Sequence, residues 1–430
     1  MSFSDCYYIK AEEFCVKVTD GTHDSPKRKT EGKFLITSKH IKSREIDFES
    51  AYLIDGIDFD KINQRSQVNQ WDVLISMIGE YCGFVYVERN FKIDYAVKNV
   101  GIFKTGEKEK AEWIYYYLSS PEGKNKLNTL RSGTSQPYIS LGALRKLPIL
   151  QFKNKNIMTG IIKILTKIDE KIHVNYQINK TLENMAQAIF KQWFVAFEFP
   201  NEDGEPYKSS GGEMVETELG MIPKGWEVGT IGNYVKVKSG YAFKSAWWDS
   251  KGIAVIKIKD INNGTLNLTD CSFVSEKNAS SAQEFIINGG EILIAMTGAT
   301  IGKFAIVPKM NHHALVNQRV GKFFLGENPF DKVSFLYCIL NQSSVYEEIV
   351  SRGDGSAQPN ISPSGIESIK IVIPNSFILD KFNRLMKFNF QKITENIYEN
   401  NKLVDLRDTL LPKLMSGEIR VPLDEEGEAS

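Results

Sequence analysis

The chain lacks the cysteine patterns that mark metal sites and disulfide frameworks. Its five cysteines are isolated, and no two of them have CxxC spacing. This disfavours zinc ribbons and disulfide-stapled secreted folds. His312 and His313 are adjacent, so they do not share a helix face, and no cysteine or acidic cluster joins them at ligand spacing. We therefore expect reduced thiols, no metal ion and a cytoplasmic location.

The sequence also lacks an excess of charge and a long apolar run. The 53 basic and 53 acidic residues give a formal net charge of zero, which disfavours a chain that coats nucleic acid or membranes through bulk electrostatics. Any polyanionic partner must then be met by local basic patches. No stretch approaches the roughly 18 apolar residues of a membrane helix, and the amino terminus has no basic region followed by an apolar run. We expect a soluble protein without a membrane partner.

Catalytic signatures are missing as well. The chain contains no Asn-Pro-Pro-Tyr or Asp-Pro-Pro-Tyr motif for methyl transfer to an amino group, and no glycine fingerprint for a nucleotide cofactor. Residues 298–303 (GATIGK) superficially resemble a phosphate-binding loop, but the spacing is one residue short and Phe304 stands at the hydroxyl position. We predict that the chain is not an enzyme by itself and binds no cofactor.

What the sequence does contain is one long internal repeat. Residues 293–298 (LIAMTG) repeat residues 74–79 (LISMIG), and residues 355–362 (GSAQPNIS) repeat residues 133–140 (GTSQPYIS), both at a distance of about 220 residues. A repeat of this length in two copies is not a solenoid, whose units are tens of residues long and number three or more. The chain is predicted to be a pseudo-two-fold molecule of two similar halves.

Each half begins with a region of mixed α/β character. The apolar runs 73–78 and 292–296 are predicted to be buried strands, and short helices are predicted at 112–118 and 333–340. The stretch 200–225 between the halves is rich in proline, glycine and serine, which is typical of a linker.

A long amphipathic segment ends each half. Apolar residues in 161–193 and in 382–414 recur in alternating steps of four and three, which is typical of a coiled-coil seam. Asparagines occupy the middle of both seams, where buried amides penalise slipped registers because a shift leaves them without partners. An antiparallel pairing of the two segments predicts two layers of amide pairs: Asn175 with Asn400 and Asn179 with Asn396.

The register is imperfect at two further layers. It sets Arg407 against Ile168. It also sets Asn389 against Ala186, so both layers are expected to be frayed or open to a partner. The alternative is that each helix packs on its own domain and the asparagines lie at a solvent edge. About 34 helical residues span roughly 50 Å, which exceeds the roughly 34 Å of one DNA turn.

These features resemble the specificity subunit of type I restriction-modification systems. The resemblance rests on the duplicated half, the two Gln-Pro loops and the helix ends 186–194 (AQAIFKQWF) and 406–414 (LRDTLLPKL). Residues 20–26 (DGTHDSP) and 219–228 (LGMIPKGWEV) also match the family, so the similarity covers nearly the whole chain.

The resemblance implies two target-recognition domains, each reading one half of a bipartite, asymmetric DNA sequence, and an intramolecular antiparallel coiled coil that separates them. In that family methylation, ATP hydrolysis and cleavage belong to other subunits, so S-adenosylmethionine, ATP and Mg²⁺ are expected on those partners. The expected partners are double-stranded DNA, two modification subunits and restriction subunits. The alternative function is a coiled-coil protein adapter that does not bind DNA.

The repeat and the resemblance together predict the domain boundaries. They are 1–155 for the first target-recognition domain, 156–197 for the first spacer helix, 198–225 for a linker, 226–376 for the second target-recognition domain, 377–417 for the second spacer helix and 418–430 for an acidic tail.

Two polar loops, one in each half, are the candidate DNA-contacting segments. Their side chains can meet phosphates and base edges, although a solvated loop would have a similar composition. Gln136 and Gln358 in the Gln-Pro loops could each make a bidentate contact with adenine, but the proline that follows favours an extended backbone and a purely structural turn. The loop residues are Thr22, His23, Ser25, Lys27, Arg28 and Lys29 in the first half and Lys238, Ser239, Gly240, Tyr241, Phe243 and Lys244 in the second.

Overall fold

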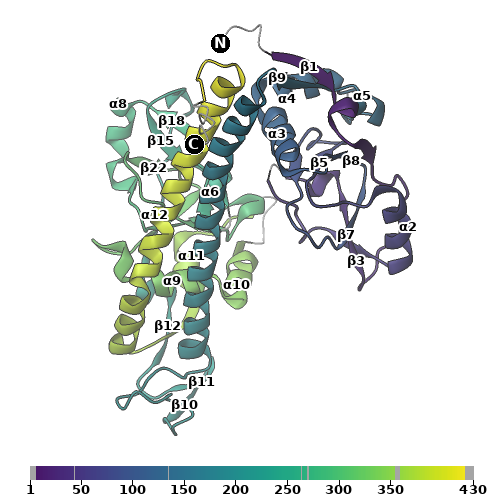
Figure 1. Ribbon diagram of the computed structural model, residues 1–430. Helices are drawn as coiled ribbons and strands as arrows, with labels where there is room; N and C mark the ends of the chain where they lie inside the picture. The colour runs from purple at the N-terminus through teal and green to yellow at the C-terminus, as the bar shows by residue number, and fades with distance from the viewer. Residues whose placement is uncertain are drawn as a thin grey trace, which may run out of the picture. The chain divides into compact units, whose positions relative to one another are not determined.

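Two compact units make up the chain in the computed structural model. The first unit comprises residues 1–170 and 403–430, and the second comprises residues 171–402, so each unit includes part of both long helices. Figure 1 shows helices and sheets in both units. The structure describes residues 6–42, 44–133, 135–262, 264–268, 271–353 and 359–421.

The first unit is built on a four-stranded antiparallel sheet with the strand order β2-β8-β5-β6. A three-stranded sheet has the order β4-β3-β7, and β1 pairs with β9. The strands are β1 (Cys6–Lys10), β2 (Lys17–Asp20), β3 (Lys33–Thr37), β4 (Tyr52–Ile54), β5 (Asp72–Ser76), β6 (Val85–Val87), β7 (Tyr95–Lys98), β8 (Val100–Lys104) and β9 (Pro148–Phe152). The helices are α1 (Ala11–Phe14), α2 (Gly56–Ser66), α3 (Lys108–Ser119), α4 (Pro121–Leu130) and α5 (Leu141–Arg145), with a 3₁₀ turn η2 (Ser38–His40).

The second unit repeats this plan. Its four-stranded sheet has the order β13-β23-β20-β21, and a second sheet has the order β14-β18-β15-β22-β19. The strands are β10 (Met214–Thr217), β11 (Gly220–Pro223), β12 (Glu227–Thr230), β13 (Lys236–Ser239), β14 (Trp248–Asp249), β15 (Ile253–Ile256), β16 (Ile261–Asn262), β17 (Thr265–Leu266), β18 (Ser272–Val274), β19 (Ile286–Ile287), β20 (Ile292–Ala295), β21 (Phe304–Ile306), β22 (Ala314–Val316), β23 (Val320–Phe324) and β24 (Lys370–Ile373). The helices are α7 (Ile231–Tyr234), α8 (Glu276–Ala279), α9 (Val333–Leu340), α10 (Ser343–Gly353) and α11 (Pro363–Glu367), with 3₁₀ turns η4 (Ser245–Trp247), η5 (Ile258–Asp260), η6 (Ser280–Phe285), η7 (Gly298–Thr300) and η8 (Pro329–Asp331).

The repeat extends from the sequence motifs to the backbone. The predicted strands at 73–78 and 292–296 are β5 and β20, and each lies inside its four-stranded sheet with every residue buried. The glycine that follows β2 and the glycine that follows β13 lie equally close to a strand carbonyl. A Cβ atom on Gly21 would lie 2.2 Å from the Val97 carbonyl oxygen, and one on Gly240 would lie 2.2 Å from that of Val316. The two units therefore share one scaffold.

The long helices α6 (Lys155–Phe190) and α12 (Ser376–Met415) pair antiparallel. Asn175 Nδ2 donates to Asn400 Oδ1 at 2.9 Å, and Asn396 Nδ2 donates to Asn179 Oδ1 at 2.8 Å. All four amides are buried. These are the two pairs that the antiparallel register predicts, and they rule out the alternative in which the asparagines face solvent.

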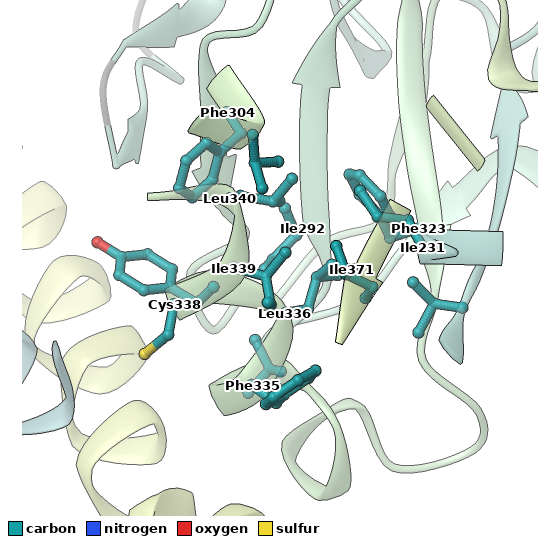
Figure 2. Close-up of a cluster of buried hydrophobic side chains, with 14 of the residues drawn as sticks. Ile231, Ile292, Phe304, Phe323, Phe335, Leu336, Cys338, Ile339, Leu340 and Ile371 are labelled. Atoms are coloured by element: carbon teal, nitrogen blue, oxygen red, sulfur yellow. The ribbon is translucent and has the colours of Figure 1, made fainter. Parts of the chain in front are cut away.

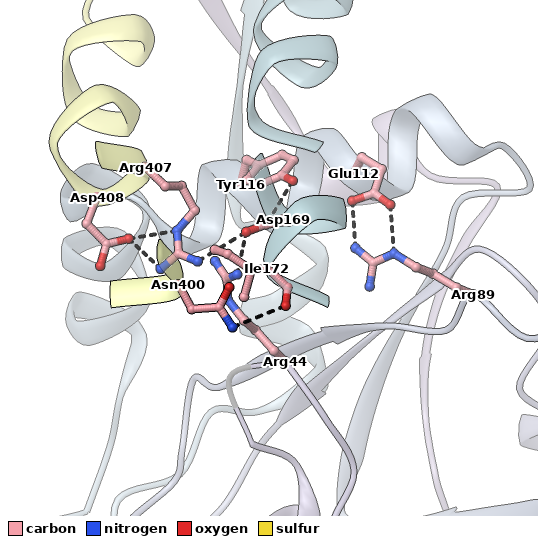
Figure 3. A network of polar contacts seen from close by, with 9 residues as sticks. All are labelled: Arg44, Arg89, Glu112, Tyr116, Asp169, Ile172, Asn400, Arg407 and Asp408. Atoms are coloured by element: carbon pink, nitrogen blue, oxygen red, sulfur yellow. Dashed lines mark hydrogen bonds and ion pairs between the residues drawn. The ribbon is translucent and has the colours of Figure 1, made fainter. Parts of the chain in front are cut away.

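The Arg407 layer is closed, contrary to the expectation of a frayed or open layer. Arg407 is only 8% exposed, and its guanidinium lies 3.1 Å from Asp169 Oδ1 and 2.6 Å from Asp408 Oδ1. Asp169 also accepts hydrogen bonds from Tyr116 and Arg44 (Figure 3). The register does set Arg407 near Ile168, but the long guanidinium side chain reaches the carboxylate of the next residue.

The stretch expected to be a linker is folded into the second unit. Strands β10 and β11 form a hairpin within it. Phe199 stacks between Tyr207 and Trp226, with ring centroids 4.6 and 4.9 Å apart, and Ile222 is buried in the same core. The aromatic residues that interrupt the glycine- and serine-rich composition explain this order, because they supply apolar area to bury.

The largest apolar core of the second unit lies between the sheet and the helices. Figure 2 shows part of it, where Phe335 and Leu336 of α9 pack near Ile292 of β20, Phe323 of β23 and Ile371 of β24. Within the described ranges, no helix is both long enough and apolar enough to cross a bilayer.

Candidate nucleic-acid interface

The two candidate loops begin at equivalent places in the scaffold. Each loop leaves its strand at the tightly held glycine, Gly21 or Gly240, and then runs beside the turn that joins two other strands. Thr22 forms a parallel bridge to Lys98 at the end of β7, and Tyr241 forms one to Asn317 directly after β22. The sheet therefore fixes the start of each loop against a neighbouring strand turn.

In the first unit this junction carries a polar cluster. His23 Nδ1 lies 2.8 Å from Asn99 Oδ1, and His23 Nε2 lies 3.1 Å from Asp20 Oδ2. Arg65 of α2 donates to the other Asp20 oxygen at 2.7 Å. Asp20 is buried whereas His23 is exposed, so the carboxylate orients the imidazole at the surface. Asn99 occupies the turn with φ of 53°, a conformation that asparagine tolerates better than most residues.

The rest of the first loop is exposed and basic. Lys98 donates to Ser25, and the Arg28 guanidinium lies 4.9 Å from the centre of the Tyr52 ring. Lys29 bridges to β4 and pairs with Asp55 at 3.5 Å. The Asp58 N–H, which donates to Asp55, lowers the pKa of that carboxyl, so Asp55 stays charged beside Lys29. Lys27 is exposed in the same run.

In the second unit the equivalent junction is hollow. A depression of about 660 Å³ lies there. Two of the predicted loop residues, Ser239 and Gly240, line it. The other lining residues come from the start of the loop, from the turns after β20 and β22 and from the end of the Gln-Pro loop. They are Ala242, Thr297, Gln318, Arg319 and Asn360.

The remaining predicted residues of the second loop divide between packing and surface. Phe243 is 9% exposed and belongs to an apolar cluster, so its ring has little surface left for a ligand. Tyr241 stacks on Trp247, with centroids 6.1 Å apart, and Lys244 lies over the same Trp247 ring at 5.4 Å. Lys238 is exposed on β13 with its ammonium 5.1 Å from the Phe324 ring centre.

The Gln-Pro loops are pinned to the turns after β5 and β20. Gly79 N donates to the Pro137 oxygen at 2.9 Å, and Gly298 N donates to the Pro359 oxygen at the same distance. The proline carbonyls thus have a structural role in both units. The Gln136 side chain is exposed, and Gln358 lies outside the described residues.

Sequence reasoning missed the strand-turn residues Asn99, Gln318 and Arg319, as well as Arg65 of α2. The repeat contained a usable signal for the turns, since position 318 lies at the repeat spacing from position 99. Arg65 had no such signal, because its counterpart region is built differently. Among the His, Cys, Asp and Glu residues that the structure describes, no group of three could hold a metal ion.

Comparison with known proteins finds a family that matches part of the chain. The family described as "Type I restriction modification DNA specificity domain" matches residues 223–397. The type I restriction enzyme MjaIX specificity subunit of Methanocaldococcus jannaschii is 29% identical over 72% of this chain and 69% of its own length. The type I restriction enzyme HindI specificity subunit of Haemophilus influenzae is 28% identical over 72% of this chain and 77% of its own length.

A solved structure shows the same fold across the whole chain. The S subunit of a type I restriction-modification system from M. genitalium superposes with a TM-score of 0.52 at 18% identity, covering 95% of this chain and 96% of that one. The fold thus defines a protein with duplicated α/β domains on an antiparallel helix pair. By sequence and by fold, the chain is similar to type I restriction enzyme specificity subunits.

Proposed function

We propose that this chain is the sequence-specific DNA-binding subunit of a type I restriction-modification complex, and that each half reads one part of a bipartite, asymmetric target. The observation that carries the proposal is the contrast between scaffold and loops. The two units share strand order and the tight glycines Gly21 and Gly240, while the side chains presented beside those glycines differ. A shared frame with different exposed groups suits the recognition of two different base sequences.

The helix pair serves as the spacer in this proposal. At 1.5 Å per residue, the 36 residues of α6 extend about 54 Å. The paired amides fix one register, because a shift along the seam would bury Asn175 and Asn396 without partners. In this proposal the register of the helix pair would set the length of the spacer in the DNA target.

Catalysis belongs to partner subunits in this proposal. Two modification subunits would bind S-adenosylmethionine and methylate adenine, and restriction subunits would use ATP and Mg²⁺ to cleave unmodified DNA. The zero net charge of the chain fits this division, since basic partners would supply much of the phosphate neutralisation on which affinity depends. We therefore propose that the chain works in the cytoplasm and binds double-stranded DNA weakly when alone.

The test is single-molecule mapping of methylated bases in DNA from a host that expresses the chain with its cognate modification subunit. We expect one bipartite motif with methylated adenines, which disappears when the chain is omitted. A soluble complex that methylates no motif would contradict the recognition role. The absence of any complex would instead favour the coiled-coil adapter.

The spacer role has a separate test. Removing one heptad at facing positions of α6 and α12 shortens the pair by about 10 Å, which corresponds to about three base pairs. The methylated motif should keep both half-sites and lose about that much of its spacer. An unchanged spacer length would contradict the proposal that the helices set the distance.

A further inference from the structure

The depression beside Gly240 lies where the two units share strand order but present different side chains. Gly240 corresponds to Gly21 at the repeat spacing, and both glycines lie against a strand carbonyl. Every other lining residue that has a counterpart differs from it. The pairs, second unit first, are Ser239 and Asp20, Ala242 and His23, Thr297 and Ile78, Gln318 and Asn99, and Asn360 and Tyr138. Arg319 is an additional residue of the second unit's turn, because the carbonyls of Val320 and Val100 accept the equivalent hydrogen bonds from Gly240 N and Gly21 N.

The turn between β22 and β23 presents Arg319 from a fixed backbone. The Arg319 N–H donates to Asn317 Oδ1 at 3.3 Å, and its carbonyl accepts from Met296 N at 3.0 Å. Gln318 N donates to the Tyr241 carbonyl at 3.0 Å, which ties the turn to the loop. The backbone of this turn is therefore held on both sides of the depression.

The Arg319 side chain, by contrast, binds none of the described residues. It is exposed, and its guanidinium makes no hydrogen bond or ion pair with any residue that the structure describes. Arg65 of the first unit shows the usual alternative, since its guanidinium is bound to the buried Asp20. Among the described residues, no carboxylate lines the depression around Arg319, so none of them repels a polyanion or occupies the guanidinium.

The chemistry of the lining suits the edge of a base pair. A guanidinium donates two parallel hydrogen bonds to O6 and N7 of guanine, and side-chain amides and hydroxyls can pair with neighbouring base edges. We infer that the depression is the base-reading site of the second half and that Arg319 reads a guanine in its half-site. This inference rests on the proposed DNA-recognition function and adds to it a specificity-determining residue and the base it recognises.

The first unit cannot make the same contact at this position. Its turn is one residue shorter and has no residue equivalent to Arg319. Asp20 there binds Arg65 and orients His23. Reading in the first unit therefore falls to His23 and Asn99, which lie at the surface of the equivalent junction. The two half-sites should then differ at the base that each strand turn faces.

The experiment uses the full-length chain in complex with its cognate modification subunit, and maps methylated motifs in host DNA. With Arg319→Ala, one guanine position of one half-site should relax, with discrimination against the other bases falling by about 10- to 100-fold. Arg319→Lys keeps the charge but cannot form the bidentate hydrogen bond, so it should reduce the preference for guanine at the same position. Arg384→Ala removes an exposed arginine of α12 in the same unit and should leave the motif unchanged.

Asn99→Ala provides the mirror test, because it should alter only the other half-site. Thermal unfolding of each variant checks that folding is intact, which the exposure of Arg319 leads us to expect for Arg319→Ala. Three outcomes overturn the inference: an unchanged motif with Arg319→Ala, a uniform loss of methylation at all sites that would indicate a phosphate contact, or changes by Arg319→Ala and Asn99→Ala in the same half-site. A wild-type complex without any motif would overturn the proposed function itself.

Discussion

The same structural position holds a charge network in the first unit and an aromatic contact in the second. In the first unit, Asp169 of α6 binds Arg407 of α12 and Tyr116 of α3. At the repeat spacing, Phe390 replaces Asp169 and Tyr337 replaces Tyr116, and these two rings meet edge-on with centroids 5.1 Å apart. Ala186, which is fully buried, takes the place of Arg407.

The difference shows that the frame does not depend on one kind of contact at this position. Both solutions fasten a globular region to its part of the helix pair, and both preserve the strand order of the sheet. They differ in cost, since an ion pair must repay the desolvation of its charges whereas an aromatic contact gains from burial. The stability of the first unit should therefore be more sensitive to the loss of a single charged partner of Asp169 or Arg407. The stability of the second unit should be more sensitive to the loss of aromatic side-chain volume.

The largest effect is expected from Phe382→Ala in the second unit. The Phe382 ring is fully buried and lies 4.9 Å from the Phe194 ring, centre to centre, so truncation leaves a cavity. The unfolding free energy should fall by about 3–5 kcal/mol, as measured by urea denaturation. Phe377→Ala is the matched control on the same helix, because Phe377 is 71% exposed. Equal losses for the two variants would contradict the claim that buried aromatic packing stabilises the second unit.

Asp169→Asn should have the next largest effect, in the first unit. The amide keeps the shape of the carboxylate but leaves the buried Arg407 with only the exposed Asp408 as an anionic partner. We expect a loss of about 2–3 kcal/mol in urea denaturation. Asp408→Asn should cost less than about 1 kcal/mol, because an exposed ion pair contributes little. If Asp408→Asn cost as much as Asp169→Asn, the network would not centre on Asp169.

The two buried asparagine pairs of the helix seam should contribute similarly to stability. Asn175→Leu leaves the Asn400 amide without its partner, and Asn396→Leu does the same to Asn179. Each change should lower the unfolding free energy by about 1–3 kcal/mol, and by similar amounts, because the two pairs are repeat equivalents. Combining Asn175→Leu with Asn400→Leu should restore much of the stability at the expense of register. Unequal single-variant losses, or no recovery in the double variant, would argue against matched buried pairs.

The smallest effect is expected on the pH dependence of stability, through the 3₁₀ turn η2. His40 Nδ1 accepts the Thr37 N–H at 2.9 Å in η2, whereas Asp260 fills the equivalent place in η5. His40 is fully buried, and burial lowers its pKa. The folded chain therefore holds this ring neutral while the unfolded chain binds a proton below a pKa of about 6.5, so stability is complete above that pH and falls as the pH drops through it.

We accordingly expect the first unit to unfold at a lower temperature at pH 5.5 than at pH 7.5. The variant His40→Asp copies the second unit and should reduce this difference. Thermal unfolding at the two pH values provides the measurement. An identical pH dependence in the variant and the wild type would show that His40 is not responsible.

Much of this fold could be predicted from the sequence, because the internal repeat and the helix periodicity extend over many residues. The repeat motifs predicted two equivalent halves, and the spacing of the seam predicted the pairing of Asn175 with Asn400. The same pattern left Arg407 unmatched, because its partner Asp169 lies off the seam and reaches it only through side-chain length. Periodicity describes the positions of Cβ atoms and not the reach of a guanidinium.

The candidate interface was harder to predict for a related reason. The loop after β13 stood out by composition, yet Phe243 in it is a packing residue and the depression owes much of its lining to the distant turn with Gln318 and Arg319. Turn residues follow neither helix nor strand periodicity, and only the fold brings this turn beside Gly240. The stretch predicted to be a linker has a glycine- and serine-rich composition, and this composition gave no sign that Phe199 stacks on Trp226 in the core.

The most direct test of independent reading by the two halves is an exchange of residues 226–376 for the matching segment of another specificity subunit with a known target. Methylation mapping of the chimaeric complex should show one half-site retained, the other replaced by that of the donor, and an unchanged spacer. A change in both half-sites would contradict the claim that each half reads its own part of the target.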